Sequence, residues 1–155
     1  MQQEFMRRAI ELSRLGMRAG KGGPFGAVIV RGDEIIAEGH NEVFLRNDPT
    51  AHAEVVAIRR AAARLNHFRL VGCEIYTSCE PCPMCLAAIH WARIQRIHFA
   101  NTADDARRMG FDDRDLYLEM KLPRAERQIP SRQLQRDAAF AVFREWQEKA
   151  DRIDY

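Results

Sequence analysis

The spacing of apolar residues changes along the chain between a helical period and short apolar runs. Apolar positions three or four residues apart, with charged residues between them, predict an amphipathic helix over residues 3–19. Runs such as G-A-V-I-V and C-E-I-Y-T, bounded by polar or glycine-containing segments, are typical of strands. The predicted helices cover residues 3–19, a segment from Asp48-Pro49-Thr50 to Leu65, and residues 83–93, 104–109 and 137–150. The predicted strands cover residues 26–30, 34–37, 73–77 and 95–100, with a fifth over 128–134 that Pro130 interrupts.

The order of these elements predicts the fold class. Residues 26–37 form an opening hairpin, and helices then alternate with strands. This order is typical of an α/β protein with helices on both faces of one sheet. We therefore expect a three-layer α/β/α sandwich with a five-stranded mixed sheet. A length of 155 residues without an internal repeat favours a single domain over residues 1–155, and residues 41–48 are expected to be a polar loop.

Composition and charge narrow the class of protein. The net charge is +2, and the arginines of residues 124–136 are mixed with acids, which indicates a solvated surface rather than a nucleic-acid-binding face. No apolar run approaches the ~18 residues of a membrane span. The N-terminus carries charges where a signal peptide would be apolar. We therefore expect a cytoplasmic protein whose cysteines stay reduced.

The segment S-C-E-P-C-P-M-C, residues 78–85, holds three of the four cysteines. A disulfide, an iron–sulfur cluster, a structural zinc or a catalytic zinc would each use closely spaced cysteines. Residues 52–54 read H-A-E, so the chain carries H-x-E followed by P-C-x-x-C, the signature of zinc-dependent deaminases. The pattern favours a catalytic zinc, one per chain.

Helix geometry explains why this spacing suits a metal. Cys82 and Cys85 share one face of a first helical turn, where free N–H groups favour thiolates. With His52 they make three ligands, which leaves a tetrahedral zinc open to water and lowers the water pKa to about 7. Glu54 lies about 200° from His52 around a helix, so the two converge only if the N-terminal end of the helix points at the metal.

The alternatives explain less of the pattern. An iron–sulfur site needs a fourth cysteine, and L-A-A-I-H-W after Cys85 contains none. A structural zinc would use four ligands, and a zinc-stabilised interaction domain without catalysis leaves Glu54 unexplained. Cys79 is interpreted as a bystander thiol and Cys73 as part of the core.

The motifs G-G-P-F-G-A-V-I-V, N-D-P-T-A-H-A-E, Y-T-S-C-E-P-C-P-M-C, W-A-R and G-F-D-D, with the C-terminal tyrosine, give the chain a family resemblance along nearly its whole length. It resembles the cytidine-deaminase-like superfamily, and within it the small bacterial guanine deaminases. The resemblance implies a five-stranded mixed sheet between helices and the hydrolysis of guanine to xanthine and ammonia. It also implies a homodimer that exchanges C-terminal segments, so that Tyr155 lines the partner's site.

The resemblance also implies roles for single residues. The zinc ligands would be His52, Cys82 and Cys85, and Glu54 would shuttle protons. Asp113 would recognise guanine and pass protons to the leaving amine. The residues expected to contact the base are Phe25, which packs on it, Asn41, which hydrogen-bonds it, Ala53, through its backbone N–H, and Tyr155.

Two relatives in the superfamily remain alternatives. Guanosine deaminases share most of these motifs. A tRNA adenosine deaminase shares A-H-A-E and E-P-C-x-M-C, but it carries a K-T-G-A-like segment after the fourth strand. Here residues 101–113 read N-T-A-D-D-A-R-R-M-G-F-D-D, which is acidic where an RNA phosphate would need cations.

Overall fold

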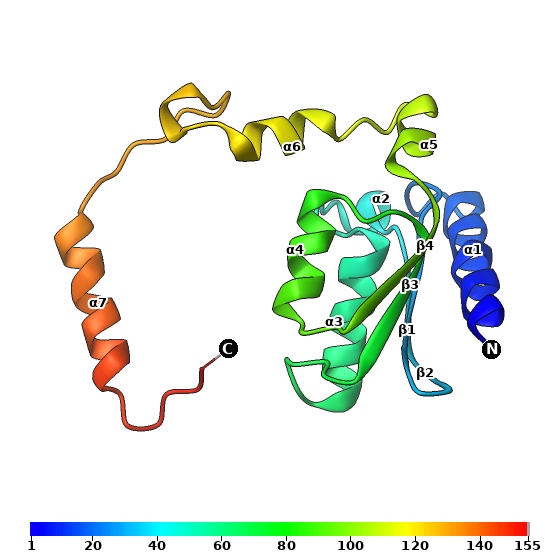
Figure 1. Ribbon diagram of the computed structural model, residues 1–155, viewed down its shortest axis with the longest axis horizontal. Coiled ribbons are helices and arrows are strands. Elements are labelled where there is room, and N and C mark those ends of the chain that lie inside the picture. Colours follow the sequence, from blue (N-terminus) through cyan, green and yellow to red (C-terminus); the bar gives the residue numbers. More distant parts are fainter. Residues whose placement is uncertain (155) are drawn as a thin grey trace. The chain divides into compact units, whose positions relative to one another are not determined.

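A mixed β-sheet organises the first of two units in the computed structural model, which describes residues 1–154 (Figure 1). This unit spans Met1–Asp113, and the second unit begins at Arg114. The sheet order is β2-β1-β3-β4; β1 pairs antiparallel with β2 and β3, and β3 pairs parallel with β4. The strands are β1 (Gly26–Arg31), β2 (Glu34–His40), β3 (Cys73–Cys79) and β4 (Arg96–Asn101). The predicted mixed sheet is confirmed, but within residues 1–154 it has four strands rather than five.

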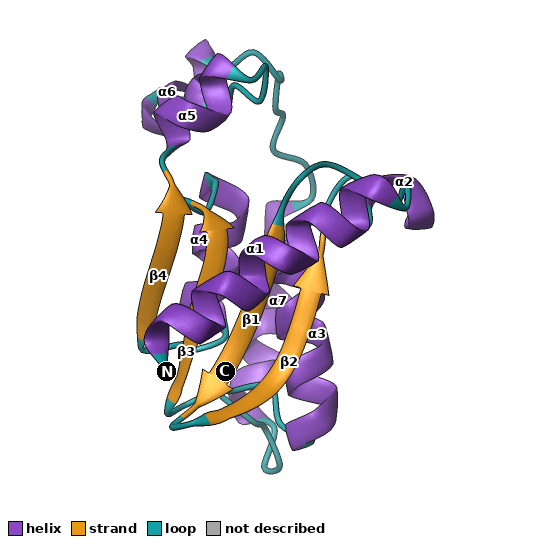
Figure 2. Cartoon of the chain, turned by 90° about the vertical axis from the view of Figure 1, so that its right-hand side faces the viewer, coloured by secondary structure: helices purple, strands orange, loops and turns teal. Residues whose placement is uncertain are grey.

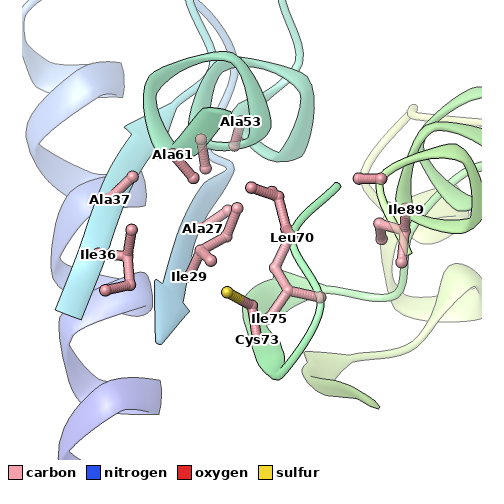
Figure 3. Packing of buried hydrophobic residues seen from close by; sticks show 12 residues of the cluster. Ala27, Ile29, Ile36, Ala37, Ala53, Ala61, Leu70, Cys73, Ile75 and Ile89 are labelled. Atoms are coloured by element: carbon pink, nitrogen blue, oxygen red, sulfur yellow. The ribbon is translucent and has the colours of Figure 1, made fainter. Parts of the chain in front are cut away.

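Helices cover both faces of this sheet. Helix α1 (Gln2–Arg18) crosses one face, and α3 (Ala53–Leu65) lies behind the sheet (Figure 2). Side chains along β1 alternate between the faces, as the pleat requires. Val28 and Val30 pack in the cluster with α1, whereas Ala27 and Ile29 pack with α3 and α4 (Pro83–Trp91) (Figure 3). The first unit is therefore layered α/β/α.

The segment between β2 and α3 differs from the sequence prediction. Residues Val43–Arg46 form a short helix, α2, inside the expected loop. Helix α3 begins at Ala53 rather than near Asp48, because the Asp48 carboxylate is used in a local turn. Its Oδ1 accepts hydrogen bonds from the backbone N–H and the hydroxyl of Thr50, at 2.8 and 2.7 Å. No helix within residues 1–154 combines the length and the apolar character that crossing a bilayer requires.

The second unit contains no strand in its described residues, 114–154, so the predicted fifth strand over 128–134 is wrong. Pro130 has no N–H to give to a strand ladder, and Ile129 and Leu134 are exposed rather than packed in a core. The elements observed are α6 (Arg114–Lys121), a 3₁₀ turn (Arg124–Glu126) and α7 (Arg136–Glu148). Helix α7 was predicted, and its apolar side chains are exposed.

A buried carboxylate ties β2, α2 and α3 together. Glu42 follows β2 and is 1% exposed. Its Oε1 accepts a 2.6 Å hydrogen bond from Arg60 on α3, and its Oε2 accepts one from Arg46 on α2. The Glu42 backbone N–H donates to the carbonyl of Ala51, next to the start of α3. Glu42 therefore fixes the segment that leads into α3.

Glu42→Gln should lower the free energy of unfolding at pH 7 by about 2 kcal/mol, because it weakens charge-assisted hydrogen bonds to two arginines. Burial raises the pKa of Glu42, but Arg46 and Arg60 outweigh it and hold that pKa below the usual range of a glutamate. The ionised form thus stabilises the fold at pH values above the pKa that a glutamate has in the unfolded chain. This stabilisation is lost as the pH falls through the lower pKa of the folded state. The difference between wild type and variant, measured by urea unfolding, should shrink below pH 4.5.

The matched control is Glu34→Gln, which breaks the exposed pair between Glu34 and Arg64. It should change stability by less than about 1 kcal/mol. Equal effects of the two substitutions would contradict a specific role for the buried carboxylate.

Candidate metal centre and its pocket

Two helix N-termini meet beside the end of β3. His52 is the N-cap of α3 and Cys82 is the N-cap of α4, and both have extended backbone (φ −67°, ψ 156° and φ −65°, ψ 168°). Pro83 occupies the first turn of α4, where its missing N–H costs no hydrogen bond. Gly39 allows α3 to lie close to the sheet, because a Cβ there would stand 2.4 Å from the Ala53 carbonyl oxygen. The sheet and the two helices thus bring residues 52 and 82 together.

The structure brings together the three predicted zinc ligands. The ligand atoms of His52, Cys82 and Cys85 lie within 4.8 Å of one another. Nδ1 of His52 is 3.6 Å from Sγ of Cys82 and 3.5 Å from Sγ of Cys85. Tetrahedral coordination with usual zinc–nitrogen and zinc–sulfur bond lengths requires a nitrogen–sulfur separation of about 3.5 Å. The imidazole therefore lies at the distance from both thiols that tetrahedral zinc coordination requires.

Electrostatic interactions within this cluster favour the thiolate form of Cys82. A hydrogen bond from the Cys85 thiol lowers the pKa of Cys82 to about 4; burial opposes this shift, and a hydrogen bond from His52 adds to it. The same thiol–thiolate hydrogen bond raises the pKa of Cys85. The pKa of His52 is also raised, chiefly by its hydrogen bond to Cys82. Negative charge is thus concentrated on Cys82, at a helix N-terminus that stabilises it.

Glu54 lies in the first turn of α3 and is buried. Because His52 precedes the helix in extended backbone, the helical rotation between residues 52 and 54 does not separate their side chains. The Glu54 carboxyl contacts the Cys85 thiol. Burial raises the pKa of Glu54, and the negative charge of Cys82 adds to the shift. A carboxyl with a raised pKa beside the ligand cluster is suited to hold and release protons.

A cavity of about 570 Å³ opens in front of this cluster. His52, Cys82 and Glu54 line it, and so do three other predicted site residues: Phe25, Asn41 and Asp113. All of its lining residues belong to the first unit. The structure therefore joins distant stretches of sequence in one pocket: the loop before β1, the segment after β2, the N-termini of α3 and α4, and the segment after α5 (Ala103–Arg108).

The loop before β1 is held by Asn41. Its side-chain Oδ1 accepts hydrogen bonds from the backbone N–H groups of Gly23 and Val43, at 3.3 and 3.2 Å. Its own backbone N–H donates to the Phe25 carbonyl, at 2.9 Å. Since Oδ1 is occupied by these donors, the amide nitrogen of Asn41 is the group left to donate to a ligand in the pocket.

Three further residues were predicted to belong to the site: Asp113, Ala53 and Tyr155. Burial raises the pKa of Asp113, and the negative charges of Cys82, Asp112 and Glu80 raise it further. Ala53 is the first residue of α3, so its backbone N–H has no acceptor within the helix. Its side chain is buried and does not line the pocket. Tyr155 lies outside the described residues.

Sequence reasoning missed several lining residues. Phe111 packs edge-on against Phe25, with 4.9 Å between ring centroids and an interplanar angle of 83°. Glu80 lines the pocket, and its Oε2 accepts a hydrogen bond from the first N–H of α5, on Ala103. Both residues lie inside motifs noted in the sequence, C-E-P-C and G-F-D-D. A single phenylalanine and a single glutamate carry no sequence signal of their own, whereas the neighbouring cysteines and paired aspartates indicate metal binding or proton transfer.

The two cysteines outside the ligand set are also placed. Cys73 is fully buried in the core cluster under α3. Cys79 lines the pocket, and its Sγ lies 3.7 Å from the carbonyl oxygen of Thr102. Burial raises the pKa of Cys79 to about 11, so at neutral pH it is a thiol rather than a thiolate ligand. All four cysteines are free of disulfide bonds.

The sequence resembles known proteins over its full length. Residues 1–101 match the family model for the cytidine and deoxycytidylate deaminase zinc-binding region. The chain is 48% identical to a guanine deaminase of Bacillus subtilis over 153 residues, which cover 99% of this chain and 98% of that protein. It is 49% identical to a tRNA-specific adenosine deaminase of Aquifex aeolicus over 77 residues, which cover 50% of this chain and 51% of that protein.

Two solved structures of guanine deaminases are also similar to this chain. The X-ray structure of guanine deaminase from Bacillus subtilis superposes with a TM-score of 0.96 at 48% identity, covering 99% of this chain and 98% of that one. A guanine deaminase from Nitrosomonas europaea superposes with a TM-score of 0.66 at 34% identity, covering 94% of this chain and 84% of that one.

Cys82→Ala should lose bound zinc, because it removes a ligand that is already a thiolate at neutral pH. Cys79→Ser should keep one zinc per chain, because the Cys79 thiol is buried and protonated. Elemental analysis of the purified variants measures this directly. Equal loss of zinc from both variants would show that Cys79 is a ligand.

Proposed function

The chain belongs to the cytidine and deoxycytidylate deaminase zinc-binding family, and we propose that it hydrolyses the 2-amino group of guanine to give xanthine and ammonia. The observation that carries the proposal is the similarity to a guanine deaminase along the whole chain. That similarity includes residues 101–113, which supply the Phe111 and Asp113 wall of the pocket. The similarity to the tRNA-specific adenosine deaminase spans only half of the chain.

The reaction needs a nucleophile at neutral pH and a group that moves protons. His52, Cys82 and Cys85 would hold a zinc ion, and such an ion would make a nucleophile available at neutral pH by lowering the pKa of a water molecule to about 7. Glu54 accepts a proton from the attacking water and gives it to a ring nitrogen of the base. A new bond forms between C2 and oxygen, and the bond between C2 and the exocyclic nitrogen then breaks. The raised pKa of Glu54 suits a group that must both take and release a proton.

The other pocket residues hold the base in place. Asp113, as a carboxylate, accepts hydrogen bonds from the N1–H and 2-amino edge of guanine. It then takes the proton that the new C2 hydroxyl group loses as the carbonyl forms, and passes it to the departing amine, which leaves as ammonia. Phe25 packs on the base, Asn41 donates its amide N–H to it, and the backbone N–H of Ala53 hydrogen-bonds it. A site that pairs with the polar edge of its substrate discriminates strongly, since a base without that edge leaves the carboxylate unpaired.

Wild-type protein should release ammonia from guanine faster than from guanosine, adenine, cytosine, cytidine or tRNA at equal concentration. Glu54→Gln should bind zinc normally and lose ~10²–10⁴-fold in turnover, because it removes the proton-transfer group without removing a metal ligand. A coupled ammonia assay and elemental analysis give the two readouts. A preference for guanosine or tRNA would replace guanine as the substrate while leaving the family intact, and a zinc-free Glu54→Gln protein would mean that Glu54 is structural.

We propose further that the protein is a cytoplasmic homodimer in which the second unit packs on another copy, so that two chains complete one catalytic domain. The four free cysteines suit a reducing compartment. In helix α7, Phe140, Phe143 and Trp146 are exposed by 40%, 70% and 41%. Apolar side chains recurring on one helix face need a partner surface. The resemblance implies an exchange of C-terminal segments between two chains. In such an exchange, a second copy of the chain would cover the apolar face of α7.

Sedimentation equilibrium of wild-type protein should give twice the chain mass of 17.9 kDa. Phe143→Glu should shift the equilibrium toward the monomer, because burying an unpaired charge in an apolar contact is unfavourable. The control is Glu145→Gln, on the same helix but outside the apolar face. A wild-type monomer, or an unchanged Phe143→Glu dimer, would contradict the proposed interface.

A further inference from the structure

The segment that carries Asp113 is fixed to the first unit at both ends of a short helix. At the start of α5, Thr102 and Asp105 form a reciprocal capping box, and the Ala103 N–H donates to Glu80 across the pocket wall, at 2.9 Å. At its end, Gly110 adopts a φ of +91°. The chain therefore leaves α5 in a defined direction toward Asp113.

The turn after α5 also determines where Phe111 lies. The N–H of Gly110 donates to the carbonyl of Arg107, and the N–H of Phe111 donates to the carbonyl of Ala106, both at 3.0 Å. This pair of hydrogen bonds is the Schellman arrangement, in which the residue after the glycine makes an apolar contact that holds the helix end. Phe111 occupies that position, and its ring makes its contact inside the pocket.

The contact of Phe111 is with the opposite wall. Its ring stands edge-on to Phe25, with ring centroids 4.9 Å apart. Space there is tight, because a Cβ added at Gly23 would lie 3.1 Å from the Phe25 ring and 3.6 Å from the Phe111 ring. Phe25 is itself held by the backbone hydrogen bond from Asn41. The aromatic pair thus connects the wall that carries Asn41 to the segment that carries Asp113.

We propose that Phe111 is a positioning residue, which holds Asp113 at the reacting edge of the purine by anchoring its segment to Phe25. The inference rests on the proposed function, since it assigns Phe111 a part in guanine turnover. Only Asp112 separates Phe111 from Asp113 in the sequence, so loss of the Phe111 ring would leave the Asp113 segment without its contact to Phe25 on the opposite wall. A shift of about 1 Å in a positioned group is enough to slow a reaction substantially.

The first test compares variants of residue 111 in steady-state turnover of guanine. Phe111→Ala should lower kcat/KM on the order of tenfold, in line with the loss of an aromatic pair, and much of the loss should appear in kcat. Phe111→Tyr keeps the ring and should restore turnover to within about twofold of wild type. The control is Met109→Ala, because Met109 is 75% exposed and does not line the pocket.

The second test separates positioning from a general effect on binding. If Phe111 acts through Asp113, then Phe111→Ala should cost little more in a protein that already carries Asp113→Ala, and the double-mutant cycle should be strongly non-additive. Losses that simply multiply would overturn the inference, as would a Phe111→Ala change confined to KM. Zinc content should match wild type in every variant; if Phe111→Ala fails to fold, Phe111→Leu replaces it in the same cycle.

Ammonia release by the wild-type protein distinguishes failure of the proposed function from failure of the positioning role of Phe111. Wild-type protein that does not release ammonia from guanine contradicts the proposed function itself. Wild-type protein that turns over guanine, together with a Phe111→Ala variant of normal kcat/KM, contradicts only the positioning role of Phe111.

Discussion

The site depends on how closely α3 approaches the sheet. Gly39 leaves room for the Ala53 carbonyl, and the small residues Ala57 and Ala61 form the buried face of the helix. Any larger side chain at position 39 would collide with the backbone of α3 and push the N-terminal part of that helix away from the sheet. Since His52 caps α3 and Cys82 caps α4, such a displacement would change the distances between the ligand atoms. Small residues far from the chemistry therefore set the ligand distances.

Two buried glutamates show how local partners decide the charge of one residue type. Glu42 is surrounded by Arg46 and Arg60, which keep its pKa low, so it serves as a charged clamp. Glu54 is buried beside Cys82 without a compensating arginine among its pKa determinants, and its pKa is raised. The first carboxylate stabilises the fold, and the second is suited to move protons. The two lie at opposite ends of the connection between β2 and α3.

Sequence patterns predicted the sheet and its main helices because burial decides those elements: β1 and β3 are buried on both faces, whereas α1 and α3 each bury one face. β1 is a nearly continuous apolar run, β3 carries a short run rich in strand-forming residues, and α1 and α3 repeat their apolar residues at the helical period. The pattern failed where burial was not the deciding factor. Asp48 has the side chain of a helix cap but turns back on Thr50, and α2 is too short to show a period. Residues 128–134 look apolar enough for a strand, yet Pro130 cannot complete a ladder.

The sequence by itself determined the chemistry of the site. H-A-E and P-C-P-M-C specify two thiols, an imidazole and a carboxyl with the spacing of a zinc centre, because helix N-termini present such residues at fixed intervals. Tertiary structure alone decided how the side chains around that centre contact one another. Phe25 and Phe111 are 86 positions apart in the sequence, and no local pattern predicts that their rings meet; the sheet order and the turn after α5 bring them together. Ligand spacing is a local property of the chain, whereas the walls of a pocket are contacts between distant segments.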